Sequence, residues 1–333
     1  MLRRRPSRPA ALRERLGPGL RIALLAVLAT AVVVVFLTID VHGYWEFILP
    51  RRLTKLGALV LMAYAVATST VLFQTITGNR ILTPSLMGFD SLYLLLQTVL
   101  VFVFSSHGLL ALDERLRFGL EVALMAVFAT ALFTWLFGSG RYGLHLLLLV
   151  GIIFGTFFRS VSSFLQRLIE PSEFVILQDR FFASFNSVPQ DLLLVSTLLI
   201  GAVSVVAVRR MRQFDVLALG REHATNLGID YRRSVMVILV LIAVMVSVST
   251  ALVGPITFFG LLVANLAYLV AGSHRHAVVI PVAALLAVII LVGGQLVLER
   301  VFAFDTSLSV IIEFLGGLLF LVLLLRSTKR TLP

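Results

Sequence analysis

The sequence contains no cysteine among its 333 residues. A chain without thiols cannot build a disulfide framework, a thiolate metal site or a cysteine nucleophile. Charged residues are also scarce, because Asp, Glu, Lys and Arg make up only 14% of the chain, against about 25% in soluble globular proteins. The hydrophobic share is 59% and the mean hydropathy is +1.03. These values exclude a soluble protein and indicate an integral membrane protein.

Catalytic signatures are missing as well. The chain has no Gly-x-x-x-x-Gly-Lys phosphate-binding loop, no Gly-x-Ser-x-Gly nucleophile elbow and no His-Glu-x-x-His zinc motif. Its six histidines include no pair at the helical spacing that zinc sites use. His274 and His276 flank Arg275 in a short polar loop, where we expect them to be solvated. We therefore expect no catalytic residue, metal or cofactor on this chain, and an intramembrane enzyme is a poor alternative.

Long apolar runs are what the sequence has in abundance. A helix needs about 20 mostly apolar residues to cross a bilayer. The runs are continuous rather than alternating, so they predict membrane-spanning helices and not the strands of a barrel. The predicted fold class is all-α: a polytopic integral membrane protein with about ten transmembrane helices. The predicted spans are 22–39, 56–74, 86–104, 117–137, 143–163, 191–208, 234–253, 256–271, 277–297 and 308–325.

The formal net charge of +11 follows the predicted topology. If the amino terminus is cytoplasmic, most Lys and Arg residues fall in cytoplasmic segments, as the positive-inside rule requires. An even number of spans then places both termini in the cytoplasm, and the basic residues reflect membrane insertion rather than nucleic-acid binding. The first run is longer than the apolar core of a signal peptide, so we interpret it as an uncleaved span. We expect a basic cytoplasmic tail (1–21), one ten-helix domain (22–326) and a cytoplasmic tail (327–333).

Two connections are longer than membrane insertion requires. The cytoplasmic loop 209–233 contains a helix-like stretch, 216–228, that is interrupted by glycines. The extracytoplasmic connector 165–191 contains prolines, phenylalanines and charges of both signs. An interfacial helix at the mouth of the bundle and a plain amphipathic connector both fit this composition.

Polar side chains within two neighbouring spans are candidates for a transport path. In the third span three of them share one helix face at spacings i, i+3 and i+7. Hydrogen-bonded helix packing explains such polar stripes as well as a hydrated path does, so both interpretations remain open. The candidate path residues are Tyr64, Thr68, Gln74, Asp90, Tyr93 and Gln97.

Carboxylates within the spans are Asp90, Glu121 and Glu313. Charged groups in a bilayer are costly and mark functional sites, but each of these lies near a predicted span end, where the cost is small. An ion-coupled secondary transporter or a channel would use Asp90 and Glu313 as coupling residues. Secondary transporters are commonly built from two repeated halves, and no such repeat is visible here.

Three motifs occur in order along the chain. The first combines Leu-Pro-Arg at 49–51 with Pro-Ser-Leu-Met-Gly at 84–88. The second is Leu-Gly-Arg-Glu-His-Ala-Thr-Asn-Leu-Gly at 219–228, and the third is Gly-Pro-Ile-Thr-Phe-Phe-Gly-Leu at 254–261. With these motifs the chain resembles the permease family of ABC importers that take up iron-siderophore complexes, haem and cobalamin.

The resemblance implies the type II ABC importer permease fold in the bacterial cytoplasmic (inner) membrane. It also implies a second permease subunit (the same chain or a related one), two ABC ATPase subunits that bind ATP and Mg²⁺, and an extracytoplasmic substrate-binding protein. The chain itself would carry a bulky substrate through the lipid bilayer without covalent chemistry. A ferric-siderophore complex is the expected substrate, with haem and cobalamin as alternatives.

The resemblance also assigns roles to individual residues. Arg51 matches the family arginine that meets acidic residues of the binding protein, and Arg300, at the outer end of the ninth span, is a second expected contact. The remaining assignments form two sets. Contact with the ATPase is expected from Leu219, Gly220, Glu222, Ala224, Leu227 and Gly228, and a structural role from Pro84, Gly88, Gly254, Pro255 and Gly260.

The chain departs from the family pattern at several positions. Ala264-Asn265 and Tyr268 stand where the family usually has Pro-His followed by Arg, and Arg80-Ile81-Leu82-Thr83 replaces a usual Pro-Leu-Ala. The stretch 73–77 (Phe-Gln-Thr-Ile-Thr) and the Ala264-Asn265 change resemble the subgroup that handles catechol-type siderophores. These features disfavour cobalamin.

Overall fold

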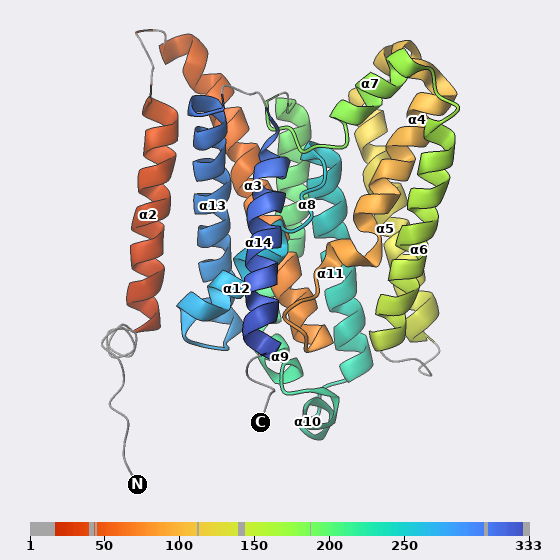
Figure 1. Cartoon of the computed structure of the whole chain (residues 1–333). Helices are drawn as coiled ribbons and strands as arrows, with labels where there is room; N and C mark the ends of the chain where they lie inside the picture. The colour runs from red at the N-terminus through yellow and green to blue at the C-terminus, as the bar shows by residue number, and fades with distance from the viewer. Residues whose placement is uncertain are drawn as a thin grey trace.

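The computed structural model describes residues 17–39, 43, 45–111, 113–138, 144–186, 188–302 and 306–328. Every regular element in this part of the chain is a helix, which confirms the predicted all-α class (Figure 1). Seven helices are long and apolar enough to cross a membrane, and three shorter apolar helices cover 89–105, 259–271 and 308–318. These ten helices match the ten predicted spans. The predicted tails, 1–21 and 327–333, lie mostly outside the described residues.

The helices that match the predicted spans run roughly parallel through the molecule (Figure 1). They are α2 (Pro18–Thr38), α3 (Trp45–Thr77), α4 (Phe89–Ala111), α5 (Glu114–Gly138), α6 (Leu144–Gln166), α8 (Gln190–Arg209), α11 (Tyr231–Val253), α12 (Phe259–Ala271), α13 (His276–Arg300) and α14 (Leu308–Thr328). Four shorter elements connect them: η1 (Pro84–Met87), α7 (Pro171–Asp179), α9 (Met211–Leu217) and α10 (Arg221–Asn226). We name the two ends of the bundle after the short helices there, the α7 face and the α10 face.

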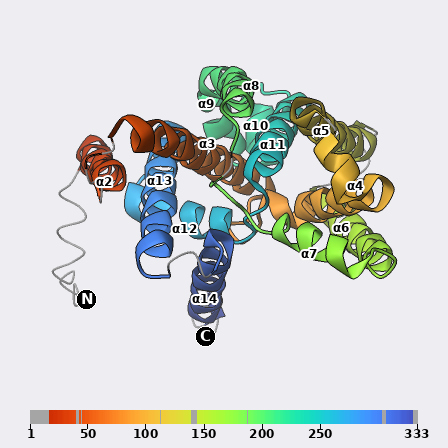
Figure 2. The same cartoon turned by 90° about the horizontal axis from the view of Figure 1, so that it is seen from above.

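The core of the bundle is built around α3. Figure 2 shows α3 between α13 and α11, with α4, α5, α6 and α7 grouped on one side and α2 at the opposite edge. The helices α3 and α11 bury two thirds of their apolar windows, whereas α2 buries 11%. Because lipid is as apolar as these side chains, the exposed apolar faces of outer helices such as α2 suit a membrane environment.

The helix α3 begins at Trp45, well before the predicted span at 56. Its 33 residues extend about 50 Å at 1.5 Å per residue, more than the roughly 30 Å of hydrocarbon. The extra turns cap α2: the Arg52 guanidinium donates to the backbone oxygens of residues 36, 37 and 39 at 3.1, 3.1 and 2.7 Å. These carbonyls lie at the end of α2, where no further helical turn satisfies them.

Two predicted spans begin with irregular backbone instead of helix. Residues 84–88 form the short η1 helix and a left-handed Gly88 (φ +88°), and the stretch from Gly254 (φ +96°) to Ile256 has no helical structure. The following α12 has 13 residues, about 20 Å, which is shorter than the hydrocarbon thickness. Irregular backbone is tolerated at membrane depth only where protein surrounds it, and Gly88, Gly254 and Ile256 are all buried.

Candidate functional site

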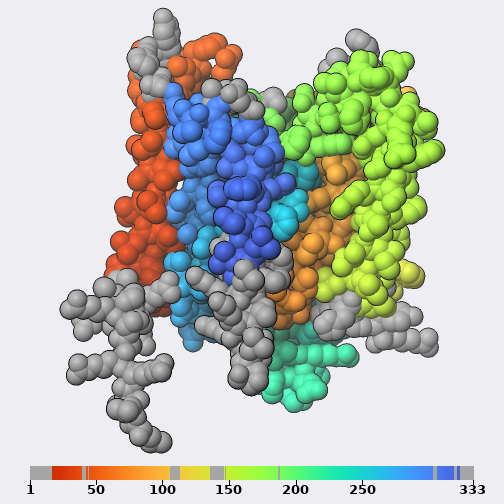
Figure 3. All heavy atoms as spheres, in the orientation of Figure 1, coloured from red at the N-terminus to blue at the C-terminus, as the bar shows by residue number. Residues whose placement is uncertain are grey.

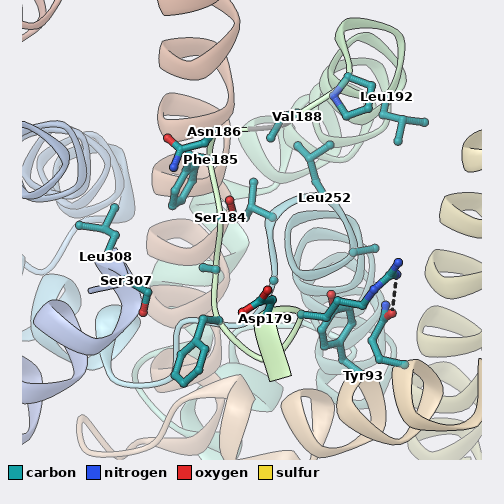
Figure 4. Close-up of a pocket in the computed structure, with 18 of the residues that line it drawn as sticks. Tyr93, Asp179, Ser184, Phe185, Asn186, Val188, Leu192, Leu252, Ser307 and Leu308 are labelled. Atoms are coloured by element: carbon teal, nitrogen blue, oxygen red, sulfur yellow. Dashed lines mark hydrogen bonds between the residues drawn. The ribbon is translucent and has the colours of Figure 1, made fainter. Parts of the chain in front are cut away.

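A cavity of about 800 Å³ opens near the α7 face. Its walls come from α4, α5, the ends of α11 and α13, the start of α14 and the segment 179–189 (Figure 4). In Figure 3 the surface is hollowed between α14 and α7. Ligand pockets typically have volumes of about 300–1,000 Å³, so this cavity is large enough for a bulky small molecule.

Two of the predicted path residues, Tyr93 and Gln97, line this cavity. They lie one turn apart on α4 and are 6% and 2% exposed. Gln97 Oε1 accepts a hydrogen bond from Arg180 Nη1 at 3.2 Å, which fixes the side chain between α4 and the end of α7. The part of the predicted polar face of α4 that carries Tyr93 and Gln97 therefore borders the cavity.

Asp90, one turn earlier on α4, lies apart from that cavity. Its Oδ2 accepts a hydrogen bond from Thr257 Oγ1 at 3.3 Å, and Glu313 Oε1 accepts one from Thr257 N at 3.4 Å. Two carboxylates from α4 and α14 thus meet the irregular segment before α12. Thr257 lies before the first turn of α12 and lacks a helical acceptor for its N–H, so Glu313 supplies the acceptor for this partly buried group.

The three predicted path residues on α3 lie within helix packing. Tyr64 is half-buried against the apolar cluster that contains Ala65 and Met245. Thr68 is 1% exposed, and Gln74 Nε2 donates to the backbone oxygen of Arg80 at 2.7 Å. None of the three is among the residues that line the large cavity.

A charged cluster lines the cavity beside Gln97; the sequence singled out only its Glu121, as a carboxylate within a span. Arg117 on α5 has its Nη2 3.9 Å from Glu114 Oε1 and its Nε 3.7 Å from Glu121 Oε1. Burial and the neighbouring Arg117 guanidinium lower the pKa of Arg180. The spacing of residues 114, 117 and 121 places them on one face of α5 and was the available signal, but the sequence does not place Arg180 opposite them.

The predicted coupling loop is built from α9 and α10 and forms the tip of the α10 face (Figure 1). Gly220 and Gly228 frame α10 with φ of +95° and +82°, values that side chains rarely adopt. Leu219 and Leu227 are 57% and 63% exposed, and Glu222 is exposed beside them. We call these three residues the coupling-loop edge.

Ala224 lies inside the coupling loop rather than on its edge. It is fully buried, and its backbone oxygen accepts a hydrogen bond from Ile229 N at 3.0 Å. The residue therefore shapes the loop from within, and its small side chain lets α10 fold back on the start of α11.

The coupling loop is anchored to the bundle through a buried histidine. Asp215 Oδ1 on α9 accepts from His276 N at 2.7 Å and lies 2.6 Å from His276 Nδ1. On the other side of the ring, His276 Nε2 lies 2.7 Å from Thr75 Oγ1. The expectation that His276 is solvated was wrong, because it is 2% exposed at the start of α13. It links α9 to both α13 and α3.

The two predicted docking arginines are exposed at the α7 face. The Arg51 guanidinium lies 4.1 Å from the ring centroid of Phe47, within cation–π distance. Arg300 is the last residue of α13. An ion pair between Lys55 Nζ and Glu299 Oε1 at 2.8 Å joins α3 to α13 close to both arginines and fixes their relative position.

The predicted structural glycines lie where backbones touch. A Cβ at Gly88 would come within 2.9 Å of Gly155 Cα, and one at Gly254 within 3.1 Å of Ala183 Cα. A Cβ at Gly260 would collide with Thr70 Oγ1, so α12 and α3 approach closely. Pro84 and Pro255, next to these contacts, are buried.

Known proteins resemble this chain along most of its length. The petrobactin import system permease of Bacillus subtilis strain 168 is 49% identical over 311 residues, which cover 93% of this chain and 98% of that protein. A petrobactin import system permease of Bacillus anthracis is 41% identical over 286 residues, 86% of this chain and 80% of that protein.

A solved structure shares the fold. It is an inward-facing conformation of an ABC transporter assigned to the metal-chelate type, with a TM-score of 0.81 over 92% of this chain and 99% of that chain. The identity is 19%, so this likeness shows the fold alone.

The sequence profile of the FecCD transport family matches residues 20–326. This range contains all ten predicted spans and the three motifs on which the resemblance rested. The predicted family is therefore confirmed: the chain belongs to the FecCD transport family.

Proposed function

We propose that this chain is the permease subunit of an ABC importer that carries a ferric siderophore of the catechol type across the bacterial cytoplasmic membrane. The observation that carries the proposal is that permeases of two petrobactin import systems are 49% and 41% identical to it over most of their length. It is a transport component and not an enzyme. The substrate path runs between the two faces of the helical bundle.

Energy would enter at the α10 face. This chain has no phosphate-binding loop, so ATP and Mg²⁺ would bind two partner ATPase subunits. The exposed Leu219 and Leu227 of the coupling-loop edge supply an apolar contact for such a partner, and fully burying a leucine contributes about 1.5–3 kcal/mol. Through Asp215 and His276, a displacement of α9 would act directly on α13 and α3.

The substrate would enter at the α7 face from an extracytoplasmic binding protein. Arg51 and Arg300 are exposed there for acidic residues of that protein. Charges at the rim of an interface mainly speed and orient encounter. The cavity beside them is the first space inside the permease that could receive the released chelate.

A second permease subunit, the same chain or a related one, completes the proposed transporter. Exposed apolar side chains cover α6 and α14, including Ile153, Phe157, Phe314 and Leu318. Part of this surface would contact the second subunit and the rest would face lipid. In this arrangement the α10 face and both termini are cytoplasmic, as the distribution of arginines predicts.

The test is iron uptake into proteoliposomes that contain the complete transporter, with ⁵⁵Fe-petrobactin loaded on the binding protein. Replacing the catalytic glutamate of the partner ATPase should abolish uptake, and collapsing proton and sodium gradients should leave it intact. Uptake that persists with the inactive ATPase and needs an ion gradient would instead support the ion-coupled alternative, with Asp90 and Glu313 as coupling residues. If haem or cobalamin inhibits the uptake and ferric catecholates do not, the substrate belongs to the haem or cobalamin class instead.

A further inference from the structure

Glu121 is a buried carboxylate with an incomplete set of partners. It is 3% exposed, and its Oε1 has no hydrogen-bond partner within the described part of the chain. The nearest cationic atom is Arg117 Nε at 3.7 Å, beyond ordinary hydrogen-bond distance. A buried charged oxygen without a hydrogen bond is costly. Glu121 also lines the cavity at the α7 face, and the small exposed part of its side chain places a molecule in the cavity next to the carboxyl group.

The charges around the cavity favour a donor that is positive. Among the described residues, three carboxylates line it (Glu114, Glu121 and Asp179) and two guanidinium groups do (Arg117 and Arg180). Arg117 already lies between Glu114 and Glu121, and Arg180 donates to Gln97. A chelate that carries only negative charge would meet this excess of carboxylates, whereas a chelate that also carries an ammonium group offsets it.

The other walls of the cavity suit aromatic rings. Tyr93 and Phe185 line it (Figure 4). Phe118 and Phe182 also belong to its lining. Aromatic side chains pair with other rings in offset or edge-to-face geometry, and their faces also attract cations. The combination of phenyl rings, two arginines and a buried carboxylate matches a molecule with rings, anionic oxygens and an amine.

We propose that Glu121 binds the protonated amine of the substrate in this cavity, and that the permease therefore prefers ferric catecholate chelates that carry such an amine. This inference rests on the proposed function, because it specifies the substrate class of the same transporter. Arg117 and Gln97 flank the carboxylate: Arg117 lies on the same face of α5, and Gln97 lines the same cavity from α4.

The test compares two ferric chelates that differ only in the charge of one nitrogen. One is the ferric complex of bis(dihydroxybenzoyl)spermidine, whose central amine is protonated. The other is the same complex acetylated at that amine. Uptake of each by the complete transporter is measured with wild type, Glu121→Gln and the control Glu170→Gln, which changes an exposed carboxylate outside the cavity lining. The binding protein is the same throughout, so its own preference cancels from the ratio of mutant to wild type.

In wild type we expect the amine chelate to be imported faster than the acetylated one. Glu121→Gln should reduce this preference about tenfold, since hydrogen bonds to charged groups are worth that much or more, and Glu170→Gln should leave it unchanged. An equal effect of Glu121→Gln on both chelates, or no effect, would overturn the proposal. A wild-type transporter that imports neither chelate, nor ferric petrobactin, would refute the proposed function instead.

A measurement on the wild-type transporter covers the case in which Glu121→Gln does not assemble. Free spermidine in excess, added after the binding protein has been saturated with chelate, should inhibit uptake of the amine chelate and leave the acetylated one unaffected. Equal inhibition of both, or none, would contradict an amine site in the cavity.

Discussion

Replacing Gly88 by alanine tests the contact between η1 and α6. A Cβ at position 88 would lie 2.9 Å from Gly155 Cα, 3.0 Å from Gly155 N and 3.1 Å from Gly151 O. All three are backbone atoms, so no side chain can rotate away to make room. Gly88 also has φ of +88°, in the left-handed region. Overpacking costs about 1–3 kcal/mol, and the left-handed backbone adds about 1–2 kcal/mol for a residue with a Cβ.

We therefore expect Gly88→Ala to destabilise the permease by about 2–5 kcal/mol and to reduce transport, because α4 starts directly after this glycine. The midpoint of thermal unfolding of the detergent-solubilised protein measures the first effect and iron uptake measures the second. Gly155→Ala separates the two contributions. Its Cβ would meet Gly88 Cα at 3.1 Å from within a regular helix. The packing cost of about 1–3 kcal/mol should therefore appear without the backbone cost, and be reduced by up to about 1 kcal/mol because alanine is favoured over glycine in a helix.

Gly201→Ala is the matched control for both variants. Gly201 is an exposed residue within α8, and a Cβ there would meet nothing within 4 Å. Alanine in place of glycine inside a helix should stabilise it slightly, by up to about 1 kcal/mol. If Gly88→Ala unfolds at the same temperature as Gly201→Ala, the close contact between η1 and α6 does not exist in the folded protein and the reasoning is refuted.

Four further predictions concern the two faces and the path between them. Ala224→Trp should abolish iron uptake while membrane insertion stays normal, because the buried site has no room for an indole; normal uptake would exclude a packed loop. Arg51→Glu should slow association with the binding protein at low salt and less at high salt, as stopped-flow kinetics can measure; equal rates at low salt would remove Arg51 from the interface. His276→Leu should lower the iron imported per ATP hydrolysed, since it breaks the links from α9 to α3; an unchanged ratio would exclude a coupling role. A cysteine at Gln97 should react with a membrane-impermeant thiol reagent, whereas one at Thr68 should stay unlabelled; the reverse would place the path along α3.

The helices could be predicted from the sequence because each apolar run is continuous and long enough to span the bilayer. The observed helix ends differ from the predicted span ends where a side-chain cap or an irregular backbone segment interrupts the regular pattern. The Arg52 guanidinium of α3 caps the end of α2, and nothing in the local sequence indicates that contact. The motifs at 84–88 and 254–261 coincide with irregular backbone, and the conformation there depends on close contacts with the backbone of α6 and of residues 182–183.

The site was harder to predict because its groups come from helices far apart in the chain. Tyr93 and Gln97 were identified by their spacing on one helix, and the structure places both at the cavity. Arg180 lies 83 residues from its partner Gln97, and no periodicity within either segment relates the two. His276 was misjudged for the same reason: its polar neighbours in sequence indicated solvent, whereas its contacts come from α9 and α3.

Several polar groups within the bundle form hydrogen bonds between helices at successive levels between its two faces. From the α10 face, His276 joins α9 to the end of α3. The backbone oxygen of Arg80 then accepts hydrogen bonds from Gln74 on α3 and from Asn265 on α12, at 2.7 and 3.0 Å. Just before α12, Thr257 holds the carboxylates of α4 and α14, and the segment after α7 is hydrogen-bonded to the end of α11. Buried polar groups without partners are costly, so the helices that share these bonds resist moving separately. A displacement that starts at the coupling loop is then expected to reach the cavity as a joint shift of α3, α12 and α13, rather than as independent motions of single helices.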